Sequence, residues 1–304
     1  MHTRRGFLKR TTLYSAGILA APALGAFRPA KAVAPVIGLQ LYTVRDFMAK
    51  DPAGTLAKVA QIGFNSLEGA TYNSGDEKFY GMDARTFAAL LKTNSLVMRS
   101  CHYRYGEDAK GALLTNGVFN GTILHDWDRA VEDAHTLGLQ YMICAWLSES
   151  ERGSLDHYKK MAADFNIAGE KCSKAGIQFC HHNHDFEFAA QGGTYPYDIL
   201  LNETDPRLVK MELDLYWATK AGQDPVKLFE AHPGRFPLWH LKDMDNTPEH
   251  KFTEVGNGTI DFKRIFAHKA TAGMKYWFVE QDQCPGSPFD SITKSITYIK
   301  QNLV

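Results

Sequence analysis

Short apolar segments alternate with longer amphipathic segments along most of the chain, and this alternation is the strongest constraint on its fold. Each apolar segment reads as a strand, and the segment after it has helical spacing and commonly ends at Gly. Eight such units in about 270 residues are the number that closes a (β/α)8 barrel. The expected strands are 36–44, 64–70, 96–103, 141–147, 177–184, 208–214, 236–243 and 276–280.

An open, doubly wound sheet is the alternative arrangement of the same units. No Gly-x-Gly-x-x-Gly turn follows the first expected strand, so nothing favours a dinucleotide-binding sheet. We therefore predict an α/β protein with one barrel domain over residues 33–304. The expected helices are 51–63, 83–94, 123–138, 154–176, 197–203, 224–234, 260–273 and 287–303.

Residues 1–32 have the organisation of an export signal. Arg4 and Arg5 precede an apolar stretch rich in Ala and Gly at 13–27, and an A-x-A cleavage pattern follows at 30–32. Twin arginines are typical of Tat signals. The alternative is an amphipathic helix or an uncleaved anchor, but the apolar stretch is short for a membrane span. We expect a periplasmic or secreted protein with no membrane span after cleavage.

The charge of the chain argues against a nucleic-acid partner. The whole chain has 34 basic and 34 acidic residues, and six of the basic residues but none of the acidic ones lie in 1–32. The remainder therefore has 28 basic and 34 acidic residues, a formal charge of −6. Neutralising phosphates calls for a basic surface instead. Whether the protein forms a homo-oligomer stays open.

Five widely spaced cysteines, without a C-x-x-C pair, favour thiols over a disulfide framework. Cys101, Cys144 and Cys180 fall within expected strands, which predicts buried free thiols. Pairing of Cys172 or Cys284 stays open.

Side chains that can bind a metal stand at the C-terminal ends of four expected strands. They are His182 and His184, Asp214, His240 and Glu280. In a barrel of parallel strands these ends converge at one mouth. Taken singly, each has an ordinary explanation, such as a hydrogen-bonded imidazole or an ion pair with a lysine. Together they predict a divalent metal site whose nitrogen and oxygen donors suit Mn²⁺, Zn²⁺, Co²⁺ or Fe²⁺ better than Mg²⁺.

Strand alternation places His182 and His184 on one face, so either imidazole is a candidate ligand. Asp214 has the alternative of an ion pair with Lys210 or Lys242. Further polar and aromatic residues fall near the same mouth. The expected substrate-binding residues are His184, Glu187, His102, Glu68 and Trp217.

Several motifs resemble those of the xylose isomerase-like TIM-barrel superfamily, which includes sugar isomerases and epimerases, inosose dehydratases and type-IV apurinic endonucleases. The resemblance covers nearly all of the chain after residue 32. It implies a carbohydrate substrate and a metal held by side chains after strands five to eight. The segments that carry it are GLQLYTVRD (38–46), IGFNSLEGA (62–70), HHNHDFEF (181–188), ELDLYWATKAGQDP (212–225), WHLKDMD (239–245), VGNGTIDFKRIF (255–266) and FVEQDQ (278–283).

The ligand set implied by this resemblance is His182, Asp214, His240 and Glu280. The last three match the family pattern directly, whereas His182 stands where family members have a Glu. The family mechanism for epimerases uses two carboxylates on opposite sides of an enediolate, which the metal stabilises. The departure at His182 puts that symmetry in doubt.

The resemblance thus implies a metal-dependent enzyme that removes a proton alpha to the carbonyl of a sugar or keto-sugar. Glu280, His182 and Lys242 are the expected catalytic residues. An isomerase or epimerase is the first interpretation, and a 3-keto-glycoside lyase or hydratase, or a keto-sugar dehydratase, is the alternative. A periplasmic sugar-binding protein without turnover is a further alternative. An apurinic endonuclease is disfavoured by the acidic charge and the export signal.

Overall fold

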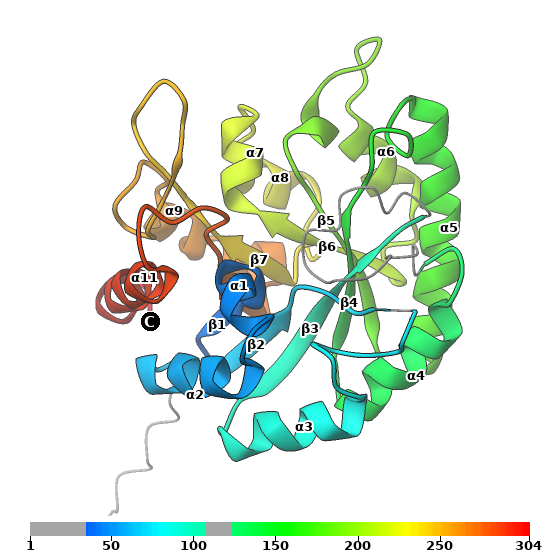
Figure 1. Ribbon diagram of the computed structural model, residues 1–304. Helices are drawn as coiled ribbons and strands as arrows, with labels where there is room; N and C mark the ends of the chain where they lie inside the picture. The colour runs from blue at the N-terminus through cyan, green and yellow to red at the C-terminus, as the bar shows by residue number, and fades with distance from the viewer. Residues whose placement is uncertain (1–34, 74, 107–122) are drawn as a thin grey trace, which may run out of the picture. The chain divides into compact units, whose positions relative to one another are not determined.

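A computed structural model describes residues 35–73, 75–106 and 123–304, so the expected signal segment lies outside the described residues. Eight parallel strands close a barrel in the order β1-β10-β7-β6-β5-β4-β3-β2, as predicted (Figure 1). The barrel strands are β1 (Gly38–Gln40), β2 (Ser66–Gly69), β3 (Val97–Arg104), β4 (Tyr141–Trp146), β5 (Gln178–His182), β6 (Val209–Asp214), β7 (Leu238–Leu241) and β10 (Tyr276–Val279).

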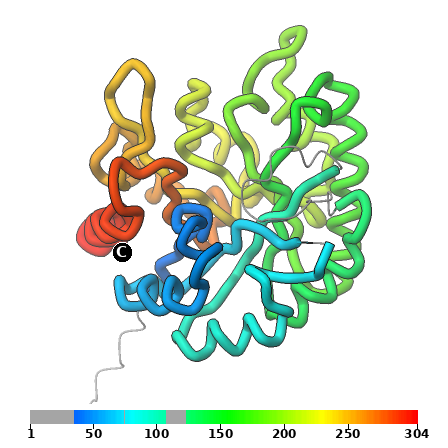
Figure 2. The backbone as a smooth tube through the Cα atoms, viewed as in Figure 1, coloured from blue at the N-terminus to red at the C-terminus, as the bar shows by residue number. Residues whose placement is uncertain are grey.

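Helices follow the strands and pack around the outside of the barrel (Figures 1 and 2). The helix expected at 260–273 is two short helices, and the helix expected at 123–138 begins only at Trp127. The helices are α1 (Arg45–Met48), α2 (Pro52–Ile62), α3 (Ala84–Thr93), α4 (Trp127–Leu137), α5 (Leu155–Lys174), α6 (Pro196–Glu203), α7 (Leu215–Lys220), α8 (Pro225–Ala231), α9 (Phe262–Ala267), α10 (Lys269–Ala272) and α11 (Pro288–Asn302), with 3-10 turns η1 (Leu41–Val44) and η2 (Phe186–Phe188).

Strands β1 and β5 end earlier than expected because side-chain hydrogen bonds replace backbone pairing there. At the end of β1, the Gln40 side chain accepts a hydrogen bond from Tyr42 N at 3.0 Å and turns the chain into η1. At the end of β5, Asn183 Oδ1 accepts from Asp214 N at 3.0 Å. His184 therefore stands just beyond the strand.

The barrel interior has an apolar lower layer and a polar upper layer. The lower layer consists of Ile143, Ala145, Cys180, Leu238 and Phe278, all buried. Closer to the C-terminal strand ends the inward positions are polar, and neighbouring strands place them side by side in register. These upper positions are Gln40, Glu68, His102, His182, Glu212, Asp214 and His240. A second, larger apolar cluster fills the space between barrel and helices.

The chain after β7 forms a small antiparallel hairpin of β8 (Asp243–Met244) and β9 (Phe252–Thr253), seen in gold in Figure 2. Asp243 accepts backbone N–H bonds from Met244, Gly256, Gly258 and Ile260, at 2.8–3.2 Å. A Cβ at Gly258 would lie 2.3 Å from Asp243 Oδ1. The Gly-x-Gly motif thus lets the backbone wrap around one carboxylate.

All five cysteines lie in the described residues and are free thiols. Cys101, Cys144 and Cys180 are buried in strands, as predicted, and Cys172 is buried in α5. Within the described ranges, no helix combines the length and apolarity that crossing a membrane requires.

Candidate active site and metal centre

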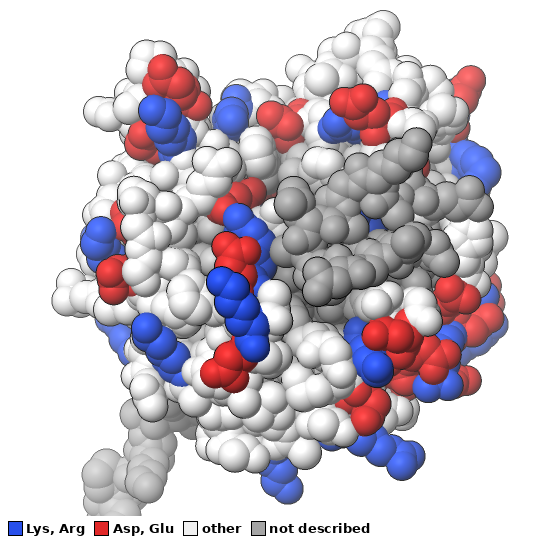
Figure 3. Space-filling view, viewed as in Figure 1, with Lys and Arg blue, Asp and Glu red and all other residues white. Residues whose placement is uncertain are grey.

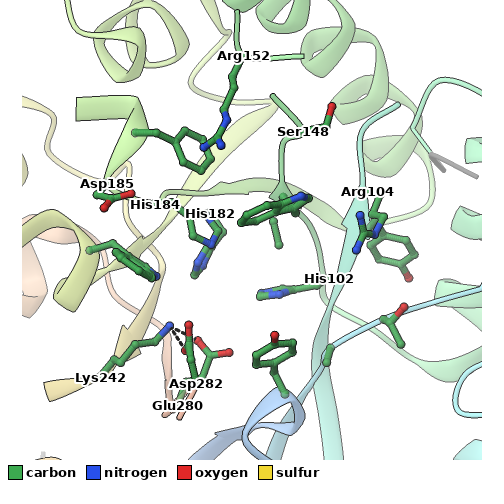
Figure 4. Close-up of a pocket in the computed structure, with 18 of the residues that line it drawn as sticks. His102, Arg104, Ser148, Arg152, His182, His184, Asp185, Lys242, Glu280 and Asp282 are labelled. Carbon is green, nitrogen blue, oxygen red and sulfur yellow. Dashed lines mark ion pairs between the residues drawn. The ribbon is translucent and has the colours of Figure 1, made fainter. Parts of the chain in front are cut away.

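A cavity of about 720 Å³ opens at the C-terminal end of the barrel, a volume within the usual range for small-molecule sites. Figure 4 shows Lys242, Glu280 and Asp282 together on one side, while His182, His184 and His102 stand around the others. Aromatic and polar side chains complete the wall. These include Tyr42, Tyr72, Arg104, Trp146, Arg152, Phe186 and Trp217.

Lys242 is the buried cation of the site, with 1% of its surface exposed. Its Nζ lies 2.6 Å from Asp282 Oδ1, 2.7 Å from Glu280 Oε2 and 3.1 Å from Asp214 Oδ2. Although burial opposes it, these carboxylates hold the pKa of Lys242 well above its usual value. Lys242 is thus a fixed positive charge at the edge of the cavity, compensated as a buried ammonium requires.

Asp214, His240 and Glu280 form the upper group, whose donor atoms all lie within 4.8 Å of one another. His240 Nδ1 is 2.9 Å from Glu280 Oε2 and 3.7 Å from Asp214 Oδ2. Asp214 Oδ1 accepts from Trp217 N at 2.8 Å and so begins the unexpected helix α7, whereas Asp214 Oδ2 faces the Lys242 ammonium and the upper group. His182 Nε2 lies 3.9 Å from that oxygen.

These donors fit a divalent cation. Two carboxylates and one or two imidazoles are a typical ligand set for such ions, and one oxygen of Asp214 is directed into the group. Burial and the neighbouring His240 lower the pKa of His182, so its imidazole is neutral, as a ligand must be. Despite its burial, Lys242 and His240 lower the pKa of Glu280, which is therefore ionised.

Glu68 orients His240 from below the upper group. Glu68 Oε1 is 2.6 Å from His240 Nε2, a contact that fixes how the imidazole is turned. Gln40 donates to Glu68 at 2.9 Å and Ser100 donates at 2.5 Å, so this carboxylate is itself held in place. His102 adds a contact at 2.9 Å.

Two of the expected substrate-binding residues do not reach the cavity. Glu68 and Glu187 are fully buried and do not line the cavity. Glu68 contacts His240, and Glu187 Oε2 accepts from the backbone N–H of His184 at 2.8 Å. Both support site residues from behind. His102, His184 and Trp217 do line the cavity, in the places expected for substrate contacts.

His184 packs against aromatic rings at the cavity wall. Its ring stacks on Phe186 with centroids 5.3 Å apart and meets Trp146 edge-on at 5.1 Å. Burial and the nearby Lys242 lower the pKa of His184, so this imidazole is neutral.

Sequence reasoning missed Asp282 and gave Glu212 no site role. Asp282 lines the cavity, and burial raises its pKa to about 6. Each stands two residues from an expected ligand: Glu212 shares a face of β6 with Asp214, and Asp282 follows Glu280 just beyond the end of β10. A search for acidic residues two positions before or after each expected ligand would have found both Glu212 and Asp282.

A family model described as "Xylose isomerase-like TIM barrel" matches residues 56–301. The chain belongs to that family. A structure described as a sugar phosphate isomerase/epimerase from Parabacteroides distasonis ATCC 8503 is 28% identical, with a TM-score of 0.74, covering 89% of this chain and 96% of that one. The structure of an IolI protein with a bound zinc atom shares the fold, at 15% identity and a TM-score of 0.63, covering 88% and 96% of the two chains.

An inosose dehydratase from Lacticaseibacillus casei is 25% identical over 197 residues, which make up 54% of this chain and 65% of the relative. The chain thus spans about two thirds of the length of that relative. Dehydratases and isomerases both occur among the similar proteins. The chain is therefore similar to sugar-modifying enzymes of both reaction types.

Proposed function

We propose that this protein is a divalent-metal-dependent lyase that removes the proton alpha to the carbonyl of a keto-sugar and then eliminates a group from the neighbouring carbon. The observation that supports this proposal is the unequal distribution of charged and neutral side chains around the cavity. Lys242 and two carboxylates stand on one side and neutral imidazoles stand on others (Figure 4). His182 occupies the strand-five position at which the resemblance implies a Glu, so a pair of carboxylate bases facing each other is not supported.

Asp214, His240 and Glu280, with His182, would hold the cation. When bound, such an ion polarises a carbonyl oxygen and makes the adjacent C–H more acidic. In this proposal Glu280 and His182 serve chiefly as ligands rather than as the catalytic acid and base expected from the sequence. The metal-binding IolI protein of the same fold supports the presence of a cation.

In the proposed elimination, different cavity residues carry out the separate proton transfers. His184 accepts the alpha proton, since its neutral imidazole lines the cavity. Lys242 stabilises the negative charge that develops on the carbonyl oxygen. Asp282 gives a proton to the departing oxygen as the C–O bond breaks and the C=C bond forms. Trp217 and Trp146 offer apolar faces to the sugar ring.

Isomerisation or epimerisation is the second candidate, favoured by the Parabacteroides distasonis relative, which matches nearly the whole chain. It shares the first proton transfer with elimination and differs in the product. A cavity with a donor and an acceptor on separate sides can also return a proton to the sugar.

One experiment separates the candidates. The metal-loaded protein is incubated in deuterated water with an inosose and with a 3-keto-glucoside, and products are followed by NMR and mass spectrometry. Elimination gives a product lighter by one water, or a released aglycone. Isomerisation or epimerisation gives a product of unchanged skeleton with one deuterium. Absence of deuterium uptake and of any product from all keto-sugars would refute both and favour a sugar-binding protein.

The His182→Glu variant tests what the strand-five position decides. We expect it to retain the cation and to lose elimination relative to deuterium exchange. His135→Glu, at an exposed position on helix α4, is the matched control. Unchanged product ratios in His182→Glu would show that this position does not select the reaction.

We also propose export by a Tat-type route, on the sequence of residues 1–32 alone. Fractionation of cells producing the chain with Arg4 and Arg5 intact or replaced by lysine tests this. The mixture of acidic and basic side chains on the face in Figure 3 accords with a small-molecule substrate and gives no support to a nucleic-acid partner.

A further inference from the structure

A second set of donor atoms lies one layer deeper in the barrel than the upper group. This lower group consists of His102 on β3, His182 on β5, Glu212 on β6 and His240 on β7, with ligand atoms all within 4.8 Å of one another. His182 and His240 also border the upper group. His102 and Glu212 belong to the lower group alone, since Glu212 precedes Asp214 by two residues on the same strand.

One carboxylate oxygen of Glu212 lies close to three imidazoles. Its Oε2 lies 3.0 Å from His102 Nε2, 3.1 Å from His182 Nδ1 and 3.3 Å from His240 Nε2. A carboxylate oxygen has two lone pairs for three nitrogens. The other oxygen, Oε1, is buried and has no hydrogen-bond partner. A network built for hydrogen bonding would use both oxygens.

The spacing of these atoms matches the first coordination sphere of a metal. Ligands about 2.0–2.1 Å from a tetrahedral Zn²⁺ lie roughly 3.3 Å from one another. The three imidazole nitrogens lie 3.0–3.3 Å from the carboxylate oxygen. Glu68 Oε1, 2.9 Å from His102 Nε2 and 2.6 Å from His240 Nε2, is close enough to serve as a further donor.

The buried carboxylates at this depth are balanced by imidazoles rather than by lysine or arginine. Among the described residues, the ion pairs of Glu68 and Glu212 are all with imidazoles. Despite burial, these carboxylates raise the pKa of His102 to about 9 and hold the pKa of His240 well above its usual value, so imidazole protons supply the compensating charge that a bound cation would replace. The upper group differs because Lys242 already compensates part of its charge.

We propose that the lower group binds a second divalent cation, next to the cation of the upper group, with His240 between them. His240 Nε2 faces the lower group and Nδ1 faces the upper group. With both ions bound, the remaining ring proton of His240 is released to solvent, and His182 binds the lower ion through Nδ1 while Asp214, His240 and Glu280 hold the upper one. Three imidazoles and a carboxylate select Zn²⁺, Co²⁺ or Fe²⁺ over Mg²⁺. The inference rests on the proposed function only for the upper cation.

Metal content tests the proposal. The full chain is stripped of metal, saturated with Zn²⁺, passed through a desalting column and analysed by mass spectrometry of the elements. We expect two ions per chain in the unmodified protein and one in His102→Asn and in Glu212→Gln. Asp214→Asn, which affects only the upper group, should also retain one. His157→Asn, at an exposed helix position, is the control and should retain two.

A spectroscopic measurement supplements the count. With two equivalents of Mn²⁺, the unmodified protein should give a coupled electron paramagnetic resonance spectrum, and His102→Asn the six-line spectrum of a single ion. One ion per chain, unchanged in His102→Asn and lost in Asp214→Asn, overturns the second site and leaves the proposed function standing. No bound ion in any variant overturns both. If Glu212→Gln does not fold, the His102→Asn result decides.

Discussion

Replacing Gly258 by Ala should destabilise the protein because Gly258 lies against the carboxylate that organises the loop after β7. The new Cβ would lie 2.3 Å from Asp243 Oδ1 and 2.4 Å from Met244 O. Restoring an ordinary contact of about 3.4 Å requires a displacement of roughly 1 Å. The Gly258 N–H bond to Asp243, now 3.0 Å long, would then be broken.

The magnitude follows from the bonds that the displacement removes. Hydrogen bonds to a charged group contribute about 1.5–3 kcal/mol each. Loss of the Gly258 bond, with weakening of the neighbouring Ile260 bond, should lower the free energy of unfolding by about 3 kcal/mol. For a domain of this size, that corresponds to a fall of roughly 6–12 °C in Tm.

Urea unfolding followed by tryptophan fluorescence measures the effect against a matched control. Gly286 has no atoms within 4 Å of a Cβ and does not require the left-handed conformation. Gly286→Ala should therefore change the free energy of unfolding by no more than about 0.5 kcal/mol, or raise it slightly. Equal unfolding midpoints for the two variants would refute the role given to Asp243.

Three further substitutions test other parts of the structure. Although burial opposes it, Lys294 lowers the pKa of Glu254 to about 2, so its contribution to stability is present above about pH 4.5 and is lost as the pH falls towards 2. Glu254→Gln should therefore be less stable by about 1–2 kcal/mol at pH 7 and equal to the parent near pH 2, by urea unfolding across pH; a constant difference would contradict this. Trp239 stacks on Phe229 at 5.0 Å between β7 and α8, so Trp239→Ala should cost about 3–5 kcal/mol by thermal unfolding, and a loss below 1 kcal/mol would disprove this packing role. Lys242→Met should reduce kcat by about 10²-fold or more while metal is retained, and near-normal turnover would exclude it as the group that stabilises the developing charge.

Much of the architecture could be predicted from the spacing of apolar residues, because strands and helices each have a characteristic repeat within a short segment of sequence. The eight strands were found at their places, and the polar strand ends converge as the barrel geometry requires. The ends of β1 and β5 were placed too late, since the side chains of Gln40 and Asn183 replace backbone partners there. Helix α7 was missed because its first turn is stabilised by Asp214, a residue whose type also suits a ligand.

The site was predicted less completely than the fold. Residue type and strand position indicated the upper group, and the structure brings its members within reach of one ion. Burial depth is not visible in a sequence, so Glu68 and Glu187 were assigned to the cavity although they stand behind it. The convergence of Glu212 with His102 depends on the stagger of β3 against β6 across the barrel, which no local pattern reveals.

The loop that Asp243 holds in place lies between a cavity residue and a surface hairpin in the sequence. Lys242, immediately before it, lines the cavity, whereas the tip of the hairpin of β8 and β9 follows Asp243 in the chain. The Phe252 ring of β9 lies 5.6 Å from Lys242 Nζ, so only changes in the hairpin tip between Met244 and Phe252 leave the surroundings of the lysine unaltered. This is the kind of junction at which a lineage can remodel the approach to a cavity and leave its chemistry intact.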